Sequence, residues 1–300
     1  MLPFSLWLYF LPVFVGPATP LTASSVTTFV GSTPTEAAIM AQLGLPFQEE
    51  LEFIKWKLDL DTLGHTFYLH IQYGATQPNT MGFKNGGFHK EYRGTYSTKS
   101  QAAGNMEGMA YQLAGGTQLK LLQLSPNLLH FLTDADGLMA STGSGWAYTL
   151  SAQQPVQNKS YSLPVYQALP TQVVDQATVV FAGRTPAQPL GEDYGYPFAK
   201  SIFKLKWKLT LYRDPQTGAP LRYTLKSNRN NREHLLEGKW QIGKGLKNQP
   251  GAAFLQLDPD QPAQSLKWLI ADEKVLFLLD KEEQLYVGNQ DFAFTLNRME

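Results

Sequence analysis

Alternating apolar and polar residues are the clearest pattern along the chain. From Lys204 to Leu211 every second residue is apolar, which places Leu205, Trp207 and Leu209 on one face and the lysines on the other. Segment 54–60 repeats this pattern around its own tryptophan. Turn signals such as Asn-Gly, Gly-Gly and Asp-Pro separate such segments. The pattern predicts antiparallel strands with short connections, folded as a small barrel or sandwich.

The chain contains two copies of one unit. FVGSTP at 29–34 recurs as FAGRTP, 152 residues later, and IKWKLDL at 54–60 recurs as LKWKLTL, at an offset of 151. Further matches follow in the same order, ending with WAYTL at 146–150 against FAFTL, 146 residues later. The fold class that we predict is therefore mostly β, with two tandem small antiparallel β-barrels at 25–151 and 177–298.

Segment 152–176 connects the two copies. It contains Pro155, Pro164 and Pro170, six Gln and few charged residues. A segment of this composition supplies little apolar surface for a core. We predict a semi-extended Pro/Gln linker.

A short helix is predicted near the start of the first copy. The string TPTE at 33–36 has the spacing of a capping box around a proline, and Gly44 follows the run 37–43. In the second copy Pro189 and Gly191 interrupt the corresponding run, which predicts a helix that is cut short.

The first residues have the pattern of an export signal. Residues 2–15 are almost entirely apolar, but these about 14 residues are fewer than the roughly 20 that cross a bilayer. Small residues follow, so we predict a signal peptide over 1–23, cleaved near Ala23. Two alternatives stay open, an apolar first strand and a retained membrane anchor. We expect an exported protein, periplasmic or extracellular, without a stable membrane span.

Composition excludes several functions. The 25 Lys+Arg balance 25 Asp+Glu, whereas a nucleic-acid binder needs an excess of Lys and Arg, so we expect no nucleic-acid partner. Apolar residues make up 43% of the chain, enough to fill a core rather than form a disordered tail. Cysteine is absent, which excludes disulfides, thiolate nucleophiles, zinc–cysteine sites and a lipoprotein anchor.

The repeated strings also carry a family resemblance. They are Phe-x-Gly-x-Thr-Pro, Ile/Leu-Lys-Trp-Lys-Leu-x-Leu, a Gly-x-Tyr/Trp strand, Tyr-Gln-Leu and a closing aromatic-x-aromatic-Thr-Leu. Together they resemble the NlpE N-terminal-domain family, named for a copper-resistance and envelope-stress protein of the bacterial cell envelope. The chain is most similar to two-copy exported members. The resemblance implies lipocalin-like barrels and a role in the envelope.

The chain departs from this family in its cysteines. NlpE looks like a lipoprotein with a Cys-x-x-Cys motif, and neither feature has a match here. In the more similar relatives, cysteines follow the Thr-Pro pair and precede the Lys-Trp-Lys strand. The corresponding positions are Thr35 and about Leu51, then Ala187 and about Ile202. A copper or redox role that uses thiolates therefore does not carry over.

Without cysteine, binding of a soft metal would fall to methionine and histidine. Met106 and Met109 form a Met-x-x-Met pair that is a weak candidate for Cu(I). The competing interpretation is that Met109 packs inward from a strand while Met106 lies in a loop. The five histidines have no recognised ligand spacing, so we expect no zinc or nickel site and no cofactor.

No catalytic constellation is evident. Asp134 and Asp136 faintly resemble a calcium loop but lack its other ligands, so an ordinary turn is predicted. The string GSGW at 143–146 lacks the spacing of a nucleophile elbow. We name no catalytic residue.

Two further groups of residues allow more than one role. The lysines of 55–57 and 204–208 form the solvated face of a strand or, alternatively, contact an anionic surface such as lipid headgroups. Four aromatic residues are expected in the barrel cores, where they line a pocket only if the barrels are hollow: Trp56, Tyr68, Trp207 and Tyr223.

These observations predict an exported envelope protein that acts by binding rather than catalysis, with NlpE-like envelope stress or metal homeostasis as its setting. Its partner is an unidentified protein or small molecule of the envelope. One alternative is a lipocalin-like carrier of a small apolar ligand, which requires a cavity. The other is an enzyme with a site between the two domains.

Overall fold

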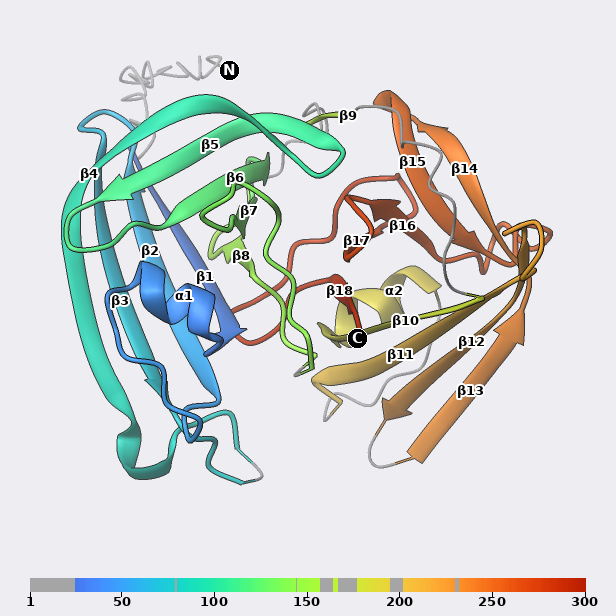
Figure 1. Cartoon of the computed structure of the whole chain (residues 1–300), viewed down its shortest axis with the longest axis horizontal. Coiled ribbons are helices and arrows are strands. Elements are labelled where there is room, and N and C mark those ends of the chain that lie inside the picture. The colour runs from blue at the N-terminus through green and yellow to red at the C-terminus, as the bar shows by residue number, and fades with distance from the viewer. Residues whose placement is uncertain are drawn as a thin grey trace, which may run out of the picture.

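The computed structural model describes residues 25–78, 80–143, 145–156, 164–166, 177–194, 202–229 and 232–300. The predicted fold class is confirmed, because 55% of the structure is strand and 7% is helical. Two nine-stranded antiparallel sheets, one from each copy, lie side by side (Figure 1). The predicted signal peptide lies outside the described residues. In the described part of the chain, no helix is long and apolar enough to cross a membrane.

The first sheet closes into an eight-stranded barrel. Its order is β4-β3-β2-β1-β8-β7-β6-β5, and pairing between β4 and β5 joins the two ends. The long strand β4 makes this closure, because its first half pairs with β3 and its second half pairs with β5. The elements are β1 (Val26–Pro34), α1 (Ala37–Gln42), β2 (Phe53–Asp61), β3 (Thr66–Gly74), the 3₁₀ turn η1 (Lys84–Gly86), β4 (Phe88–Ala103), β5 (Met106–Ala114), β6 (Lys120–Ser125), β7 (Leu128–Phe131), β8 (Thr149–Ala152) and β9 (Val165–Tyr166).

The second sheet repeats this order but stays open. Its strands run β13-β12-β11-β10-β18-β17-β16-β15-β14, and the edge strands β13 and β14 do not pair with each other. These two strands correspond to the two halves of β4, interrupted at Lys239. The elements are β10 (Thr178–Pro186), α2 (Gln188–Tyr194), β11 (Lys204–Arg213), β12 (Pro220–Arg229), β13 (Arg232–Gly238), β14 (Trp240–Leu246), β15 (Gln249–Leu257), β16 (Lys267–Ile270), β17 (Val275–Leu279) and β18 (Thr295–Arg298).

The repeated strings form the same contacts in both copies. Nε1 of Trp56 donates to Oγ1 of Thr33 at 2.8 Å, and Nε1 of Trp207 donates to Oγ1 of Thr185 at 2.7 Å. Gly31 is the cross-strand partner of Trp56 and lies against β8, and Gly183 is the partner of Trp207 and lies against β18. A Cβ atom at Gly183 would come within 2.5 Å of the Leu296 side chain, so no larger residue fits. The repeated strings are therefore packing motifs.

Each copy carries a short helix, and the prediction for the second is wrong. α2 has 7 residues against 6 in α1. Pro189 is tolerated because it lies in the first turn, where its missing N–H would have no helical partner. The prediction of a capping box is also wrong, since Pro34 is the last residue of β1 and the side chain of Glu36 makes no capping hydrogen bond. Gly44 does end the first helix, with φ of +64°.

Thr35 and Leu51, two of the four positions singled out by the resemblance, lie together in the first copy. The Thr35 hydroxyl donates to the Leu51 carbonyl at 2.5 Å, and both residues are buried. In the second copy Ala187 is buried and its backbone N–H donates to the carbonyl of Phe203. Hydrogen bonds thus tie the chain before each helix to the segment that leads into the next strand.

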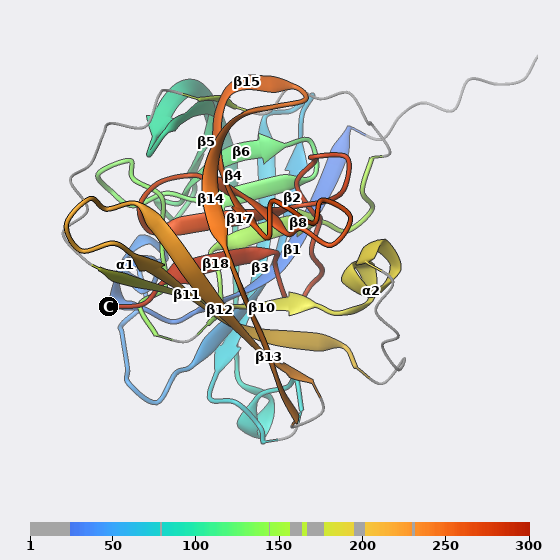
Figure 2. The same cartoon turned by 90° about the vertical axis from the view of Figure 1, so that its right-hand side faces the viewer.

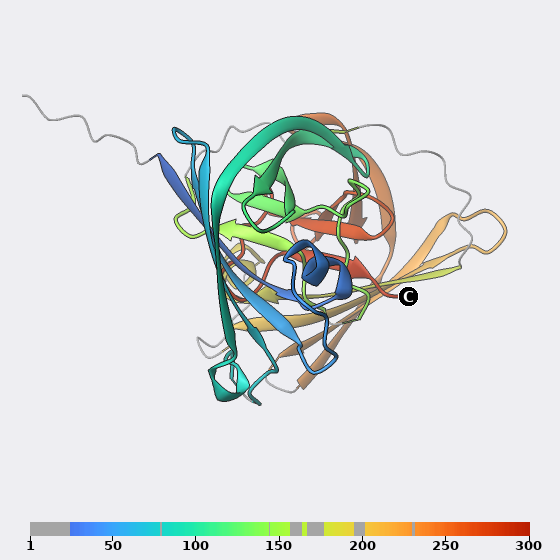
Figure 3. The same cartoon turned by 60° about the vertical axis from the view of Figure 1, so that its left-hand side comes forward.

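The interior of the first barrel is occupied by its own side chains. Helix α1 lies at one end of the barrel (Figure 3) and inserts Ile39 and Met40, both fully buried, into the cluster. Across the interior, the rings of Trp56 and Phe131 are 4.7 Å apart. A second cluster of the same kind, which includes Leu190 of α2, fills the second copy.

A third buried cluster joins the copies, and we call it the seam. Neighbouring residues of β6 belong to different clusters: Leu121 packs in the core of the first barrel and Leu122 packs in the seam. The seam combines strands β5–β7 with β14–β17 and the segments beside them. Its buried members are Ala103, Met106, Ala110, Leu122, Leu124, Leu128, Leu132, Leu138, Leu246, Ala252, Phe254, Leu269, Ala271, Val275, Phe277, Leu279 and Leu285.

Equivalent residues of the two copies meet at the seam. The hydroxyls of Thr149 and Thr295 are 3.0 Å apart, and these residues are 146 positions apart, the offset of the repeat. Trp146 stacks on Phe292 at the same offset, with centroids 5.6 Å apart. Contacts between equivalent positions indicate a pseudo-two-fold axis, as in an isologous dimer.

Part of the predicted linker is attached to the first copy. The side chain of Asn127 bonds both the N–H and the carbonyl of Val156. Strand β9 adds to β5, with Met106 opposite Tyr166.

Candidate functional site

Strands β10, β11 and β12 of the second sheet are adjacent (Figure 2), and their outer face carries several cationic residues. Alternation along β11 points Leu205 and Trp207 inward, so the lysines between them point outward. β10 and β12 add cations on the same face. The six residues, which we call the basic face, are Arg184, Lys204, Lys206, Lys208, Arg222 and Lys226.

Like charges oppose one another directly on this face. Arg184 is the cross-strand partner of Lys206, and Lys208 is the partner of Lys226. Directly opposed like charges destabilise a sheet. Among the described residues, only Lys226 of the six makes an ion pair, with Glu233 at 2.9 Å. The face therefore carries an excess of positive charge, only part of which is balanced by Glu233, in a protein whose net charge is zero.

Two of these cations lie over aromatic rings beside the seam. The guanidinium of Arg184 is 4.8 Å from the ring centroid of Trp146, and Nζ of Lys204 is 5.2 Å from that of Phe203. Burial lowers the pKa of both groups, and the neighbouring Arg184 lowers that of Lys204 further. Partly dehydrated cations without an ion pair offer strong sites for an incoming anion.

The matching face of the first copy carries less positive charge. Ser32 occupies the position of Arg184, and His70 that of Lys226, because His70 opposes Lys57 as Lys226 opposes Lys208. Lys55 is neutralised by Asp291 at 3.0 Å. Since the first copy folds without such a charge cluster, the shared fold does not need it.

The two candidate metal-ligating methionines point to opposite faces of β5. Met106 is 1% exposed and belongs to the seam, whereas Met109 is 44% exposed. This is the reverse of the packing interpretation from sequence. In the part of the chain that the structure describes, no three His, Asp or Glu side chains are close enough to hold a metal ion.

Three of the four predicted aromatic residues face the interior. Trp56, Trp207 and Tyr223 are buried in the cores of their copies. The prediction for Tyr68 is wrong, because it lies on the outer face of β3, with the Arg93 guanidinium 4.8 Å from its ring centroid. Its neighbour Phe67 occupies the interior position.

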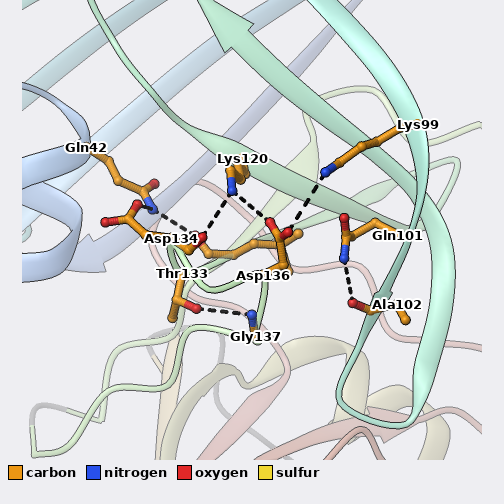
Figure 4. Close-up of polar contacts among 10 residues, drawn as sticks. Gln42, Lys99, Gln101, Ala102, Lys120, Thr133, Asp134, Asp136 and Gly137 are labelled. Atoms are coloured by element: carbon orange, nitrogen blue, oxygen red, sulfur yellow. Dashed lines mark hydrogen bonds and ion pairs between the residues drawn. The ribbon is translucent and has the colours of Figure 1, made fainter.

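The acidic turn at Asp134 and Asp136 is an ordinary turn, as predicted. Figure 4 shows Lys120 and Lys99 pointing at Asp136, with Nζ–O distances of 2.8 and 3.8 Å. The hydrogen bond from Lys120 lowers the pKa of Asp136. Gln42 donates to Asp134 at 3.0 Å. The second copy repeats the arrangement with Lys267 and Glu283, and Asp136 and Glu283 share a φ of 62°.

A hydroxyl–imidazole pair lies between the two copies, with His130 against Phe277 of the seam. Nε2 of His130 is 2.9 Å from the Met139 carbonyl, which only accepts, so Nε2 carries the proton and Nδ1 accepts from Thr149 at 2.9 Å. The Thr149 oxygen then accepts from Thr295. A nucleophile and its base have this spacing. However, His130 is 0% and Thr149 3% exposed, so no substrate reaches the pair.

Sequence reasoning found only part of the basic face. The stripe of lysines on β11 was visible from alternation, but Arg184, Arg222 and Lys226 were not connected with it. Their common face depends on the register between strands. The available signal was the spacing of Arg222 and Lys226, which share the face of a strand at even intervals.

No protein-family model, curated protein or solved structure matches this chain. The resemblance to the NlpE N-terminal domain therefore rests on the repeated strings alone.

Proposed function

We propose that this protein acts by binding and that its basic face docks on an anionic lipid surface of the cell envelope. The carrying observation is two pairs of directly opposed like charges, Arg184 with Lys206 and Lys208 with Lys226. Such pairs weaken a sheet. Glu233 already offsets Lys226, whereas an external anion would offset Arg184, Lys206 and Lys208. Export, which this role needs, stays a prediction from the first 23 residues.

A surface of many charges fits the face better than one small anion. The cations lie on three strands, and neighbouring strands are about 4.8 Å apart, so no single phosphate reaches them all. In an anionic bilayer the headgroups present distributed charge, worth about 1 kcal/mol for each nearby Lys or Arg.

Exposed apolar side chains at the edges of the face favour lipid over a soluble polyanion. Leu235 is the cross-strand partner of Lys226 and is 49% exposed. Phe203 precedes Lys204 and is 53% exposed. Apolar side chains beside cations insert at the boundary between headgroups and acyl chains.

The alternatives gain less support. A carrier needs an apolar cavity, and the first barrel's interior is occupied by its own aromatic and aliphatic side chains. An enzyme at the domain boundary needs an accessible site, and the seam is a packed apolar cluster.

Sedimentation with lipid vesicles tests the proposal, using a protein that retains all of residues 25–300. The protein should bind vesicles that contain phosphatidylglycerol, less so at high salt, and should not bind pure phosphatidylcholine. The double change Lys206→Glu and Lys208→Glu should weaken binding at least tenfold. Lys57→Glu is the matched control, since Lys57 holds the position of Lys208 in the other copy. Equal binding to neutral vesicles, or by the double variant, would overturn the proposal.

A further inference from the structure

We propose that His70 and His89 form a binding site for one divalent transition-metal ion, such as Ni²⁺ or Zn²⁺, on the outer face of the first barrel. Nε2 of His70 and Nδ1 of His89 are 3.2 Å apart. The rings are 5.4 Å apart between centroids and inclined by 26°. The two residues are separated by 19 positions in the chain, so the sequence alone did not pair them.

The nitrogen–nitrogen distance suits a shared ion. A Zn–N bond to imidazole measures about 2.0–2.1 Å, so two nitrogens on one tetrahedral ion lie about 3.3 Å apart. Both rings would turn so that the two lone pairs, which now lie along the contact between the nitrogens, converge on a common point. An ion would replace the present contact between the two nitrogens, and the histidine that donates in it would carry its N–H on its other ring nitrogen instead, so both rings bind as neutral imidazoles.

The backbone holds the two histidines in place. They lie on neighbouring strands, β3 and β4, at diagonal positions, because His89 opposes Gln72 and His70 opposes Glu91. β3 pairs with β2 on its other side, so it is fixed from both edges. The Gln72 amide also donates to the Gly86 carbonyl at 2.8 Å, close to the start of β4.

The site is open to solvent and would be completed by water. His89 is exposed and His70 is half-buried. Glu91 lies beside His70 but is held by Arg93, at 3.8 Å, and by the Tyr68 hydroxyl. The protein therefore supplies two imidazole ligands, which suit Ni²⁺ and Zn²⁺. Lys57, the cross-strand partner of His70 on β2, repels the positive charge of the ion and so lowers the affinity for it.

The first copy alone carries this pair, which makes the site independent of the proposed function. The position of His70 in the second copy is Lys226, a member of the basic face. A failure of vesicle binding would leave the metal site untouched, and the reverse also holds.

Isothermal titration with Ni²⁺ and with Zn²⁺, in a buffer that does not bind metals, tests the inference on the whole chain. We expect one ion per chain and a raised unfolding temperature, since the ion binds the native state. His70→Gln and His89→Gln should each weaken binding at least tenfold, whereas His234→Gln, on the exposed strand β13, should not. Changing Met106 and Met109 should also have no effect.

Circular dichroism of each variant without metal shows whether it still folds. Absence of one-to-one binding by the unaltered protein would overturn the inference. So would binding that survives both histidine changes in folded protein.

Discussion

The two copies agree in their first four strands and differ where the sheet closes. Both copies have the hydrogen bond from tryptophan to threonine and the turn in which a lysine forms a salt bridge with an acidic residue. Only the first has a continuous closing strand, β4, whereas the second is interrupted at Lys239. Only the second carries the basic face. The comparison separates contacts that specify the fold, which occur twice, from features that occur once and are free to serve another role.

Removing the repeated tryptophan should have the largest effect. Trp56→Ala and Trp207→Ala should each lower the free energy of unfolding by about 4 kcal/mol, because each leaves a large cavity in a core. Each also removes the partner of a buried threonine hydroxyl. Urea unfolding measures both losses, and Leu63→Ala, at a side chain 84% exposed, should have little effect. A loss in only one copy would contradict the equivalence of the two cores.

The same variants test whether the copies unfold together. The seam is a buried apolar cluster to which both copies contribute, so one thermal transition is expected for the unaltered protein and for both variants. Two transitions, with each variant shifting only one, would show that the copies are independent domains.

His130, which the second copy replaces with Phe277, should make the protein acid-sensitive. Burial lowers its pKa to about 4 from 6.5, so between these values the unfolded chain binds a proton that the folded protein excludes. Stability should therefore fall as pH drops through this window, by up to about 3 kcal/mol. His130→Phe should remove this contribution, while leaving Thr149 without its acceptor. Unfolding by urea at several pH values measures it, with His234→Gln as the control.

Asp272 should act in the opposite sense. It lies at the β16–β17 turn, against Gly104 of the first copy, and burial raises its pKa to about 6 from 3.8. The folded protein thus holds a proton that the unfolded chain has lost, and this stabilisation disappears as pH rises from 3.8 to 6.

Asp272→Asn keeps the acceptor for the N–H groups of Lys274 and Val275. The variant should be more stable than the unaltered protein at pH 7, by at most about 3 kcal/mol, and no more stable below pH 4. An unchanged pH profile in urea unfolding would show that Asp272 is hydrated.

Much of the fold was readable from the sequence because its strands alternate and its unit repeats. The seam was not. Residues 275–279 are all apolar, and Leu121 and Leu122 are adjacent apolar residues, as in strands buried on both faces. Alternation assigns one face of such a strand to its own barrel, but the partner of the other face is a distant surface. A single sequence does not state which surfaces meet.

The sites were harder to predict for a related reason. The lysines of β11 were visible as a stripe, but Arg184 and Lys226 join them only through strand register. His70 and His89 meet in the same way. Helix α2 was misjudged because proline was treated as a helix breaker regardless of its position in the first turn.

The pseudo-two-fold axis has a consequence for the joined chain. In a dimer of identical subunits, a residue on the axis faces its own copy, so the contact must be histidine with histidine or phenylalanine with phenylalanine. Here the ring of His130 meets that of Phe277 edge-on, 5.3 Å between centroids. Fusion of the two halves thus permits a single buried imidazole at the centre. It also makes the chain of hydrogen bonds run one way, with Thr295 donating to Thr149 and Thr149 donating to His130, which a symmetric pair could not do.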